Sequence, residues 1–289
     1  MSTLTPKNYS ASLALITTCI LWASAFVLIR KAVRVYTPED VAFLRYMVAS
    51  LVMLGLYFMR TRHNTVRLID LPKLFFMGVV GIAIYNLALN SGELHLPSAT
   101  ACFIISQIPV LSTVFACLFL KEALTAKAVL GLVISFCGVL IIAINGFTEL
   151  GSGLCILYVI ISALCGSTFS VMQKPLLKHV DPFQLVAWSI WSGTLVMMFW
   201  APSTWQQLHV APLNITFDVV FIGVFPAAIA YALWSYGIAH LPVNCAVRYL
   251  YAMPLIALIL GWVMLGEFPS QLSIIGGVVA VLGAILASL

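Results

Sequence analysis

Long apolar runs, separated by short polar joints, occupy nearly the whole chain and limit what it can fold into. Of its 289 residues, 63% are apolar and only 8% are charged, whereas roughly a quarter of the residues in soluble domains are charged. A membrane-spanning helix needs roughly 20 mostly apolar residues, and about ten runs have that length: 11–30, 38–59, 73–93, 97–120, 127–146, 151–173, 182–201, 216–238, 242–265 and 271–288. The sequence therefore predicts a multi-pass integral membrane protein.

Helices, rather than the strands of a barrel, are the expected spanning elements. A barrel would show alternating segments of about 10 residues, whereas runs such as AVLGLVISFCGVLIIAI are continuously apolar. The joints are too short to form a soluble domain, so any activity must occur within or across the bilayer. We predict an all-α fold with ten transmembrane helices.

One part of the sequence repeats another at a fixed offset. Residues 93–111 read ELHLPSATACFIISQIPVL, and residues 238–256 read IAHLPVNCAVRYLYAMPLI. A shift of 145 residues aligns them, and the alignment continues through a Glu and two Gly: His95 with His240, Pro97 with Pro242, Pro109 with Pro254, Glu122 with Glu267, Gly131 with Gly276, and Gly138 with Gly283. We predict two five-helix repeats, 1–146 and 147–289.

An odd number of helices in each repeat determines the orientation of the second copy. Because five is odd, the second repeat must enter the membrane inverted with respect to the first. Inverted repeats place a pseudo-two-fold axis in the membrane plane, with the substrate site near its middle where the copies meet. We therefore expect a central cavity between the repeats.

The positive charges predict which side of the membrane each joint faces. With the N-terminus inside, the inner joints hold nine Lys and Arg residues and the outer joints hold three: Arg30, Lys31 and Arg34. An excess of Lys and Arg marks cytoplasmic loops. The expected topology has both termini in the cytoplasm, and the expected location is the cell inner (plasma) membrane.

Four stretches of the chain resemble a known transporter family. They are LWASAFVLIRKAV (21–33), TPEDVAFLRYMVAS (37–50), LKEALTAKAVLGLVISFCGVLII (120–142) and its echo LGEFPSQLSIIGGVVAVLGAIL (265–286). They resemble the drug/metabolite transporter superfamily, specifically its EamA-type ten-helix members. The resemblance implies a cavity lined mainly by the first, third, fourth, sixth, eighth and ninth helices. It also implies export of amino acids or other small metabolites, without fixing the substrate.

Polar and aromatic residues within the apolar runs are the candidate substrate contacts. Such groups face protein or water rather than lipid, although many only bond a neighbouring helix. The candidates are Trp22, Ser24, Tyr85, Asn86, Asn90, Phe103, Ser106, Gln107, Ser167, Ser170, Tyr231, Trp234, Ser235, Asn244, Arg248 and Tyr251.

Arg248 is the candidate with the most specific chemistry. A charge within a membrane-spanning helix is costly and by default suggests a functional site. Helical spacing places Arg248 on one face with Asn244 and Tyr251, and a guanidinium beside an aromatic ring suits a carboxylate with a flat or apolar body. The alternative is a side chain that extends to the lipid headgroups.

Arg45 is the other cation within an apolar run. Glu39 and Asp40 lie one or two turns away on the same predicted helix, which favours a structural ion pair. Attraction of an anion at the outer mouth of the cavity is the alternative.

Two prolines and two glutamates mark equivalent points of the repeats. Pro109 and Pro254 interrupt their helices past mid-membrane, so they form either packing kinks or a paired hinge at the cavity edge. Glu122 and Glu267 end their helices, where a carboxylate can cap the next helix or pair with a basic loop. We assign a structural role to both glutamates.

Other classes of function find little support in the residues. The seven cysteines lie in or beside apolar runs without metal-ligand spacing, the nine acidic residues lie at or beyond helix ends, and no P-loop pattern occurs. We therefore predict no metal, no cofactor and no nucleic acid partner, and the sequence offers no convincing site for a coupling ion.

The predicted function is transport and not enzymatic catalysis. We expect a monomer or weak homodimer in the lipid bilayer that exports small molecules by alternating access, with aromatic or apolar amino acids as the leading substrates. An exchanger of anionic phosphate esters or nucleotide sugars is the alternative within transport. An intramembrane enzyme and a non-transporting receptor or assembly subunit are the alternatives from other classes.

Overall fold

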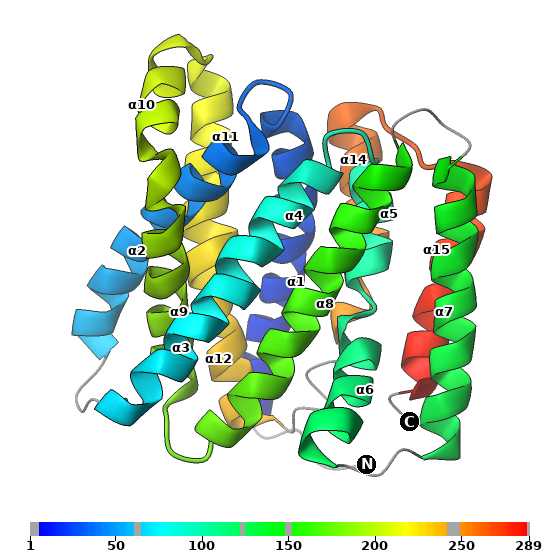
Figure 1. The fold of residues 1–289 in the computed structure, drawn as a ribbon, viewed down its shortest axis with the longest axis horizontal. Helices are drawn as coiled ribbons and strands as arrows, with labels where there is room; N and C mark the ends of the chain where they lie inside the picture. The colour runs from blue at the N-terminus through cyan, green and yellow to red at the C-terminus, as the bar shows by residue number, and fades with distance from the viewer. Residues whose placement is uncertain (1–5, 61–64, 122–124, 148–151, 242–248, 288–289) are drawn as a thin grey trace.

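The computed structural model describes residues 6–60, 65–121, 125–147, 152–241 and 249–287. Four of the residues singled out above, Glu122, Pro242, Asn244 and Arg248, lie outside these ranges. The described residues form a bundle of helices without strands (Figure 1). The predicted all-helical membrane fold is confirmed at this level.

Eight helical stretches in the described ranges are long and apolar enough to cross a membrane: Tyr9–Ala32, Pro38–Arg60, Leu68–Gly92, Ser98–Leu120, Ala126–Ile144, Gly153–Leu176, Pro182–Val210 and Leu213–His240. Two further apolar helices are shorter, α14 (Met253–Leu265) and α15 (Gln271–Ala287). The 13 residues of α14 rise only about 20 Å, less than the roughly 30 Å of hydrocarbon in a bilayer. The count of ten crossings therefore stays a prediction.

Several of these stretches consist of more than one helix. The unbroken ones are α1 (Pro6–Ala32), α2 (Pro38–Arg60), α7 (Ala126–Phe147) and α8 (Ser152–Leu176). The composite ones are η1 (Leu68–Asp70), α3 (Leu71–Gly78), η2 (Val79–Ile84) and α4 (Tyr85–Gly92); α5 (Ser98–Ile105) and α6 (Ile108–Leu120); α9 (Pro182–Met197), η3 (Met198–Trp200) and α10 (Ala201–Val210); and α11 (Leu213–Val224), η4 (Phe225–Ile229) and α12 (Ala230–His240).

The seventh stretch is longer than the sequence predicts. We expected it to end at residue 201, but it continues through the 3₁₀ turn η3 and through α10 to Val210. Pro202 marks this point in the sequence, and it occupies the first turn of α10. Proline is tolerated there because the backbone N–H that it lacks has no partner within the helix.

Irregular backbone recurs in the two halves of the chain at the offset of 145 residues. The π-helical segments η2 and η4 end at Ile84 and Ile229. Turns interrupt the helical path at 106–107 and again at 251–252. Lys121 and Gly266, which follow α6 and α14, have left-handed φ angles of 57° and 64°. The two halves thus share their helical defects, as a duplicated unit would.

Glycines bring α7 and α15 into close contact, and the two helices lie side by side in Figure 1. A Cβ atom on Gly138 would lie 2.5 Å from the carbonyl oxygen of Gly276, and one on Gly131 would lie 2.6 Å from that of Gly283. Small residues allow helix backbones to approach in this way. Gly131, the earlier glycine of α7, lies against Gly283, the later one of α15, and Gly138 lies against Gly276. The two helices are therefore antiparallel.

The surface of the bundle is apolar over most of its height. Large side chains such as Phe58, Phe119 and Phe199 are exposed, which suits a protein whose solvent is lipid. Buried apolar side chains form two clusters, one that includes Phe26 and Phe103 and another that includes Tyr46 and Phe183.

The close α7–α15 contact predicts that a glycine-to-alanine substitution destabilises the protein at this contact but not at an exposed glycine elsewhere. Gly138→Ala should lower the free energy of unfolding by about 1–3 kcal/mol, because the added methyl group meets backbone atoms that cannot move aside. Gly55→Ala has no atom within 4 Å of the new methyl group and should be neutral or stabilising. Thermal unfolding in detergent measures both, and equal stabilities would contradict the close packing.

Candidate functional site

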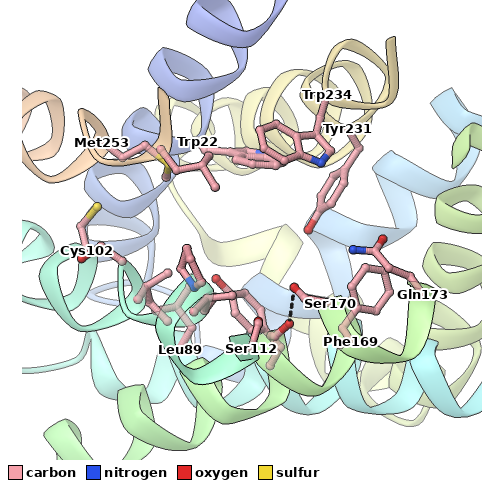
Figure 2. Close-up of a pocket in the computed structure, with 18 of the residues that line it drawn as sticks. Trp22, Leu89, Cys102, Ser112, Phe169, Ser170, Gln173, Tyr231, Trp234 and Met253 are labelled. Carbon is pink, nitrogen blue, oxygen red and sulfur yellow. Dashed lines mark hydrogen bonds between the residues drawn. The ribbon is translucent and has the colours of Figure 1, made fainter. Parts of the chain in front are cut away.

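A cavity of about 710 Å³ lies within the bundle, between residues from both halves of the chain (Figure 2). Its volume falls in the range typical of small-molecule sites. At one end it reaches Lys174, an exposed residue near the end of α8. At the other end Ile29, Leu89 and Cys102 line it, and all three are buried. The cavity is therefore open at one end of the bundle, the open end, and closed at the other, the closed end.

Three aromatic side chains from α1 and α12 form one wall of the cavity. The Trp22 ring lies 5.2 Å from the Tyr231 ring and 5.4 Å from the Trp234 ring, measured between centroids. The indole N–H of Trp22 donates to the carbonyl oxygen of Pro226 at 3.0 Å, which fixes the ring against η4. Figure 2 shows Phe169, Ser170 and Gln173 of α8 facing this wall across the cavity. Such a wall can pack against a flat apolar body.

Arg45 supplies a positive charge to the cavity from α2. The side chain lines the cavity and is 5% exposed. One guanidinium N–H donates to Asn86 Oδ1 at 3.1 Å, and Cζ lies 5.2 Å from the centre of the Tyr46 ring. Among the described residues, nothing accepts a hydrogen bond from Nε. The charge of Arg45 also acts on the side chains of Tyr85 and Tyr231.

The expected ion pair between Arg45 and an acid of its own helix is not formed. The Asp40 carboxylate instead accepts hydrogen bonds from Thr37, Ser203 and Thr204, at 2.6–2.7 Å. Within the described ranges the salt bridges involve other residues than Arg45 and Glu39. Arg45 is therefore held by a neutral amide and an aromatic ring, and no counter-ion for its charge is found in the part of the chain that the structure describes.

The cavity brings together about half of the predicted contacts. Seven of them line it: Trp22, Tyr85, Ser106, Ser170, Tyr231, Trp234 and Tyr251. Pro109, the predicted hinge residue, lines it too. Seven predicted contacts are not among the lining residues: Ser24, Asn86, Asn90, Phe103, Gln107, Ser167 and Ser235. Pro254 is buried in α14 and does not line the cavity either.

Several of the residues that do not line the cavity form hydrogen bonds to backbone carbonyls of their own or a neighbouring helix. The Ser24 hydroxyl donates to the Leu21 carbonyl and the Ser235 hydroxyl to that of Tyr231. The Asn90 side-chain amide donates to the Pro38 carbonyl at the start of α2. Phe103 is apolar and packs against Gly277, where it occupies the space that a side chain would need. The spacing of polar residues along a helix therefore did not distinguish residues that line the cavity from residues that bond within the bundle.

The break before Pro109 forms part of the cavity wall. α5 ends at Ile105 and α6 begins at Ile108. Side chains satisfy the backbone at this break: the Ser106 hydroxyl donates to the Phe103 carbonyl at 2.6 Å, and the Ser167 hydroxyl donates to the Ile108 carbonyl at 3.2 Å. The predicted interruption is thus a broken helix at the cavity, and its role as a hinge stays a prediction.

Sequence reasoning missed several cavity residues. Ser112 lines the cavity from α6, and its hydroxyl has no partner among the described residues. Gln173 and Lys174 line it from α8, on the same face as Gly166 and Ser170. Their helical spacing from Ser170 was a usable signal in the sequence.

Charged side chains join several helices at the closed end. The Arg30 guanidinium lies 3.1 Å from the Glu267 carboxylate, and Arg34 contacts the same carboxylate. Lys31 pairs with Asp218 at 2.6 Å. Arg30 also donates to the backbone carbonyls of Glu93 and Leu94. These contacts connect the end of α1 to the ends of α4 and α14 and to α11.

Comparison with known proteins agrees with this architecture. The chain is 34% identical to the uncharacterized transporter YdfC of Bacillus subtilis over 91% of its length and 86% of that protein's. It is 30% identical to a protein of Streptantibioticus cattleyicolor named a probable terminal-alkyne amino-acid exporter, over 97% and 94%. A protein of known crystal structure superimposes with a TM-score of 0.66 at 20% identity and covers 96% of each chain, which supports the fold alone.

The family relationship extends over both halves of the chain. The EamA-like transporter family matches residues 9–144 and, separately, residues 153–289. With its apolar helices and its internal cavity, the chain belongs to the EamA-like transporter family.

Proposed function

We propose that this transporter exports amino acids, with aromatic or apolar side chains preferred, by alternating access. The observation that carries the proposal is a cavity, open at one end only, that combines an aromatic wall with the unpaired Arg45 cation. A carboxylate on Arg45 and an apolar body against Trp22 and Trp234 would use both features. The name of the Streptantibioticus relative, a probable amino-acid exporter, points to the same substrate class.

Arg45 favours a substrate with a single carboxylate over a phosphate ester. A buried cation without a counter-ion attracts an anion strongly, because water does not screen it. Hydrogen bonds to charged groups contribute about 1.5–3 kcal/mol each. The described residues that line the cavity include two cations, Arg45 and Lys174, and Lys174 is exposed at its rim. A phosphate ester or nucleotide sugar would call for several cations around one point.

Alternating access would arise from two inverted five-helix repeats with ten crossings. The antiparallel contact between α7 and α15, whose glycines correspond at an offset of 145, supports this arrangement. α1 begins and α15 ends at the same end of the bundle (Figure 1), as an even number of crossings requires. The excess of Lys and Arg at this end favours a cytoplasmic location for it, so the cavity would face the cytoplasm.

Transport would need no covalent chemistry. A ligand shifts a conformational equilibrium only by the difference between its affinities for the two states. The substrate would enter from the open end, and rearrangement of the repeats would expose it at the closed end.

Removing the charge of Arg45 should weaken binding of carboxylate substrates. Arg45→Met should reduce affinity for an amino acid by about 10- to 100-fold, from the loss of about 1.5–3 kcal/mol, and should leave affinity for the corresponding amine without a carboxylate unchanged. Binding to the purified protein and counterflow in liposomes measure this. Arg60→Met is the control, because Arg60 stacks on Phe183 outside the cavity. Equal losses of affinity for the amino acid and the amine would show that Arg45 does not bind the carboxylate.

The aromatic wall should determine side-chain preference. Trp234→Leu should reduce affinity for phenylalanine about 2- to 10-fold more than affinity for alanine, because one ring contact contributes about 0.5–1.5 kcal/mol. Competition binding with the two amino acids measures the ratio. Trp205→Leu is the control, since Trp205 is exposed on α10 and does not line the cavity. An unchanged ratio would argue against stacking on this wall.

The inverted topology predicts opposite sides for two equivalent histidines. Both histidines are exposed: His95 follows the end of α4, and His240 is the last residue of α12. In a cysteine-free background, His95→Cys should react with an impermeant thiol reagent from outside the cell and His240→Cys only from the cytoplasmic side. Labelling of both from one side would exclude inverted repeats without affecting the substrate proposal.

A further inference from the structure

A carboxyl group without a partner is buried at the closed end of the cavity. Glu93 caps the end of α4 and is 0% exposed. Neither of its carboxyl oxygens has a hydrogen-bond partner among the described residues. A buried carboxylate without a partner is strongly disfavoured, and such a group takes up a proton instead.

Two arginines share one carboxylate beside this group. Arg30 and Arg34 both contact Glu267, whereas Arg30 reaches only the backbone oxygen of Glu93. With Glu93 protonated, the four side chains carry one net positive charge. If Arg30 moved to Glu93 and Arg34 kept Glu267, each arginine would have its own carboxylate, and Glu93 would have released one proton.

Glu93 lies between the cavity and the charged contacts that close it. Leu89, one helical turn earlier on α4, lines the cavity, and so does Ile29, the residue before Arg30. Opening of the closed end would break the contact between Arg30 and Glu267, while Arg30 stays beside the end of α4, where it contacts the carbonyls of Glu93 and Leu94. Loss of the Arg30–Glu267 contact would free Arg30 for the Glu93 carboxylate.

We propose that Glu93 is a proton-binding site of this transporter, which holds a proton while this end of the cavity is closed and releases it when the end opens. The proposal rests on the alternating access proposed above. The O–H bond of Glu93 breaks, the proton passes to water at that end, and Arg30 exchanges Glu267 for the Glu93 carboxylate.

The surroundings of Glu93 determine the direction of the pH effect. Burial raises the pKa of the Glu93 carboxyl well above its usual value, although the charges of Arg30 and Arg45 act against this and Glu267 acts with it. Cys102 of α5 and Tyr85 of α4 are the other titratable groups within reach, and both are neutral when protonated. The closed form therefore holds the proton at low pH. A rise in pH favours release of the proton and opening.

Thiol labelling tests the proposal directly. In a cysteine-free background, Leu89→Cys reports opening of the closed end, and His95→Cys, exposed at the same end, corrects for the ionisation of the thiol itself. The impermeant reagent is applied on the side from which His95→Cys reacts. The labelling rate of Cys at 89 relative to 95 should rise with pH by up to about tenfold per unit, the slope for one proton.

Three variants separate Glu93 from other groups. Glu93→Gln, a neutral mimic of the protonated form, should keep the ratio low and independent of pH, whereas Glu39→Gln, a carboxyl change at the start of α2, should behave as wild type. Glu267→Gln frees Arg30 for Glu93 and should shift the midpoint to lower pH. A flat profile in the wild type, or an unchanged slope in Glu93→Gln, would overturn the proposal. The assay needs no substrate, so failure of amino acid counterflow would count against the proposed function alone.

Discussion

The hydrocarbon core of a bilayer cannot form hydrogen bonds with the protein, and the rest of this structure depends on that constraint. Every polar group within the bundle needs a partner from the protein, and most have one: serine hydroxyls bond carbonyls of their own helices, and Asp40 is surrounded by three hydroxyl groups. Among the described residues, few buried polar atoms are left without a partner, and three of the residues concerned lie at the cavity: Arg45 and Ser112 line it, and the Glu93 carboxyl lies just beyond its closed end. The others belong to Asn90, Thr100 and Trp188.

The closed end of the cavity depends on charge, whereas the helix contacts elsewhere depend on shape. Glycines of α7 and α15 allow backbone contact that any side chain would prevent. By contrast, Arg30, Arg34 and Glu267 meet through long side chains that can exchange partners without repacking an apolar core. A rigid helix pair and a replaceable ionic contact would suit the alternating access proposed above.

Much of the candidate site could be predicted because polar and aromatic residues are rare in apolar helices. Trp22, Tyr85, Ser170, Tyr231 and Trp234 were expected at the cavity and line it. Asn86 and Asn90 were expected there for the same reason, but they bond neighbouring helices. Sequence pattern identifies which residues must avoid lipid. It cannot tell a cavity from a helix contact, because both satisfy the same requirement.

The sequence by itself determined the membrane class, the helical fold, the repeat of 145 residues and the helix breaks before Pro109 and Pro254. These properties depend on apolar length, on proline and on glycine, which act within a few residues along the chain. Only the tertiary structure decided that two arginines share Glu267. It also decided that, among the described residues, Arg45 has no counter-ion and the buried Glu93 carboxyl has no hydrogen-bond partner. Whether a charge is paired depends on which helices meet around it, and those helices are far apart in the sequence.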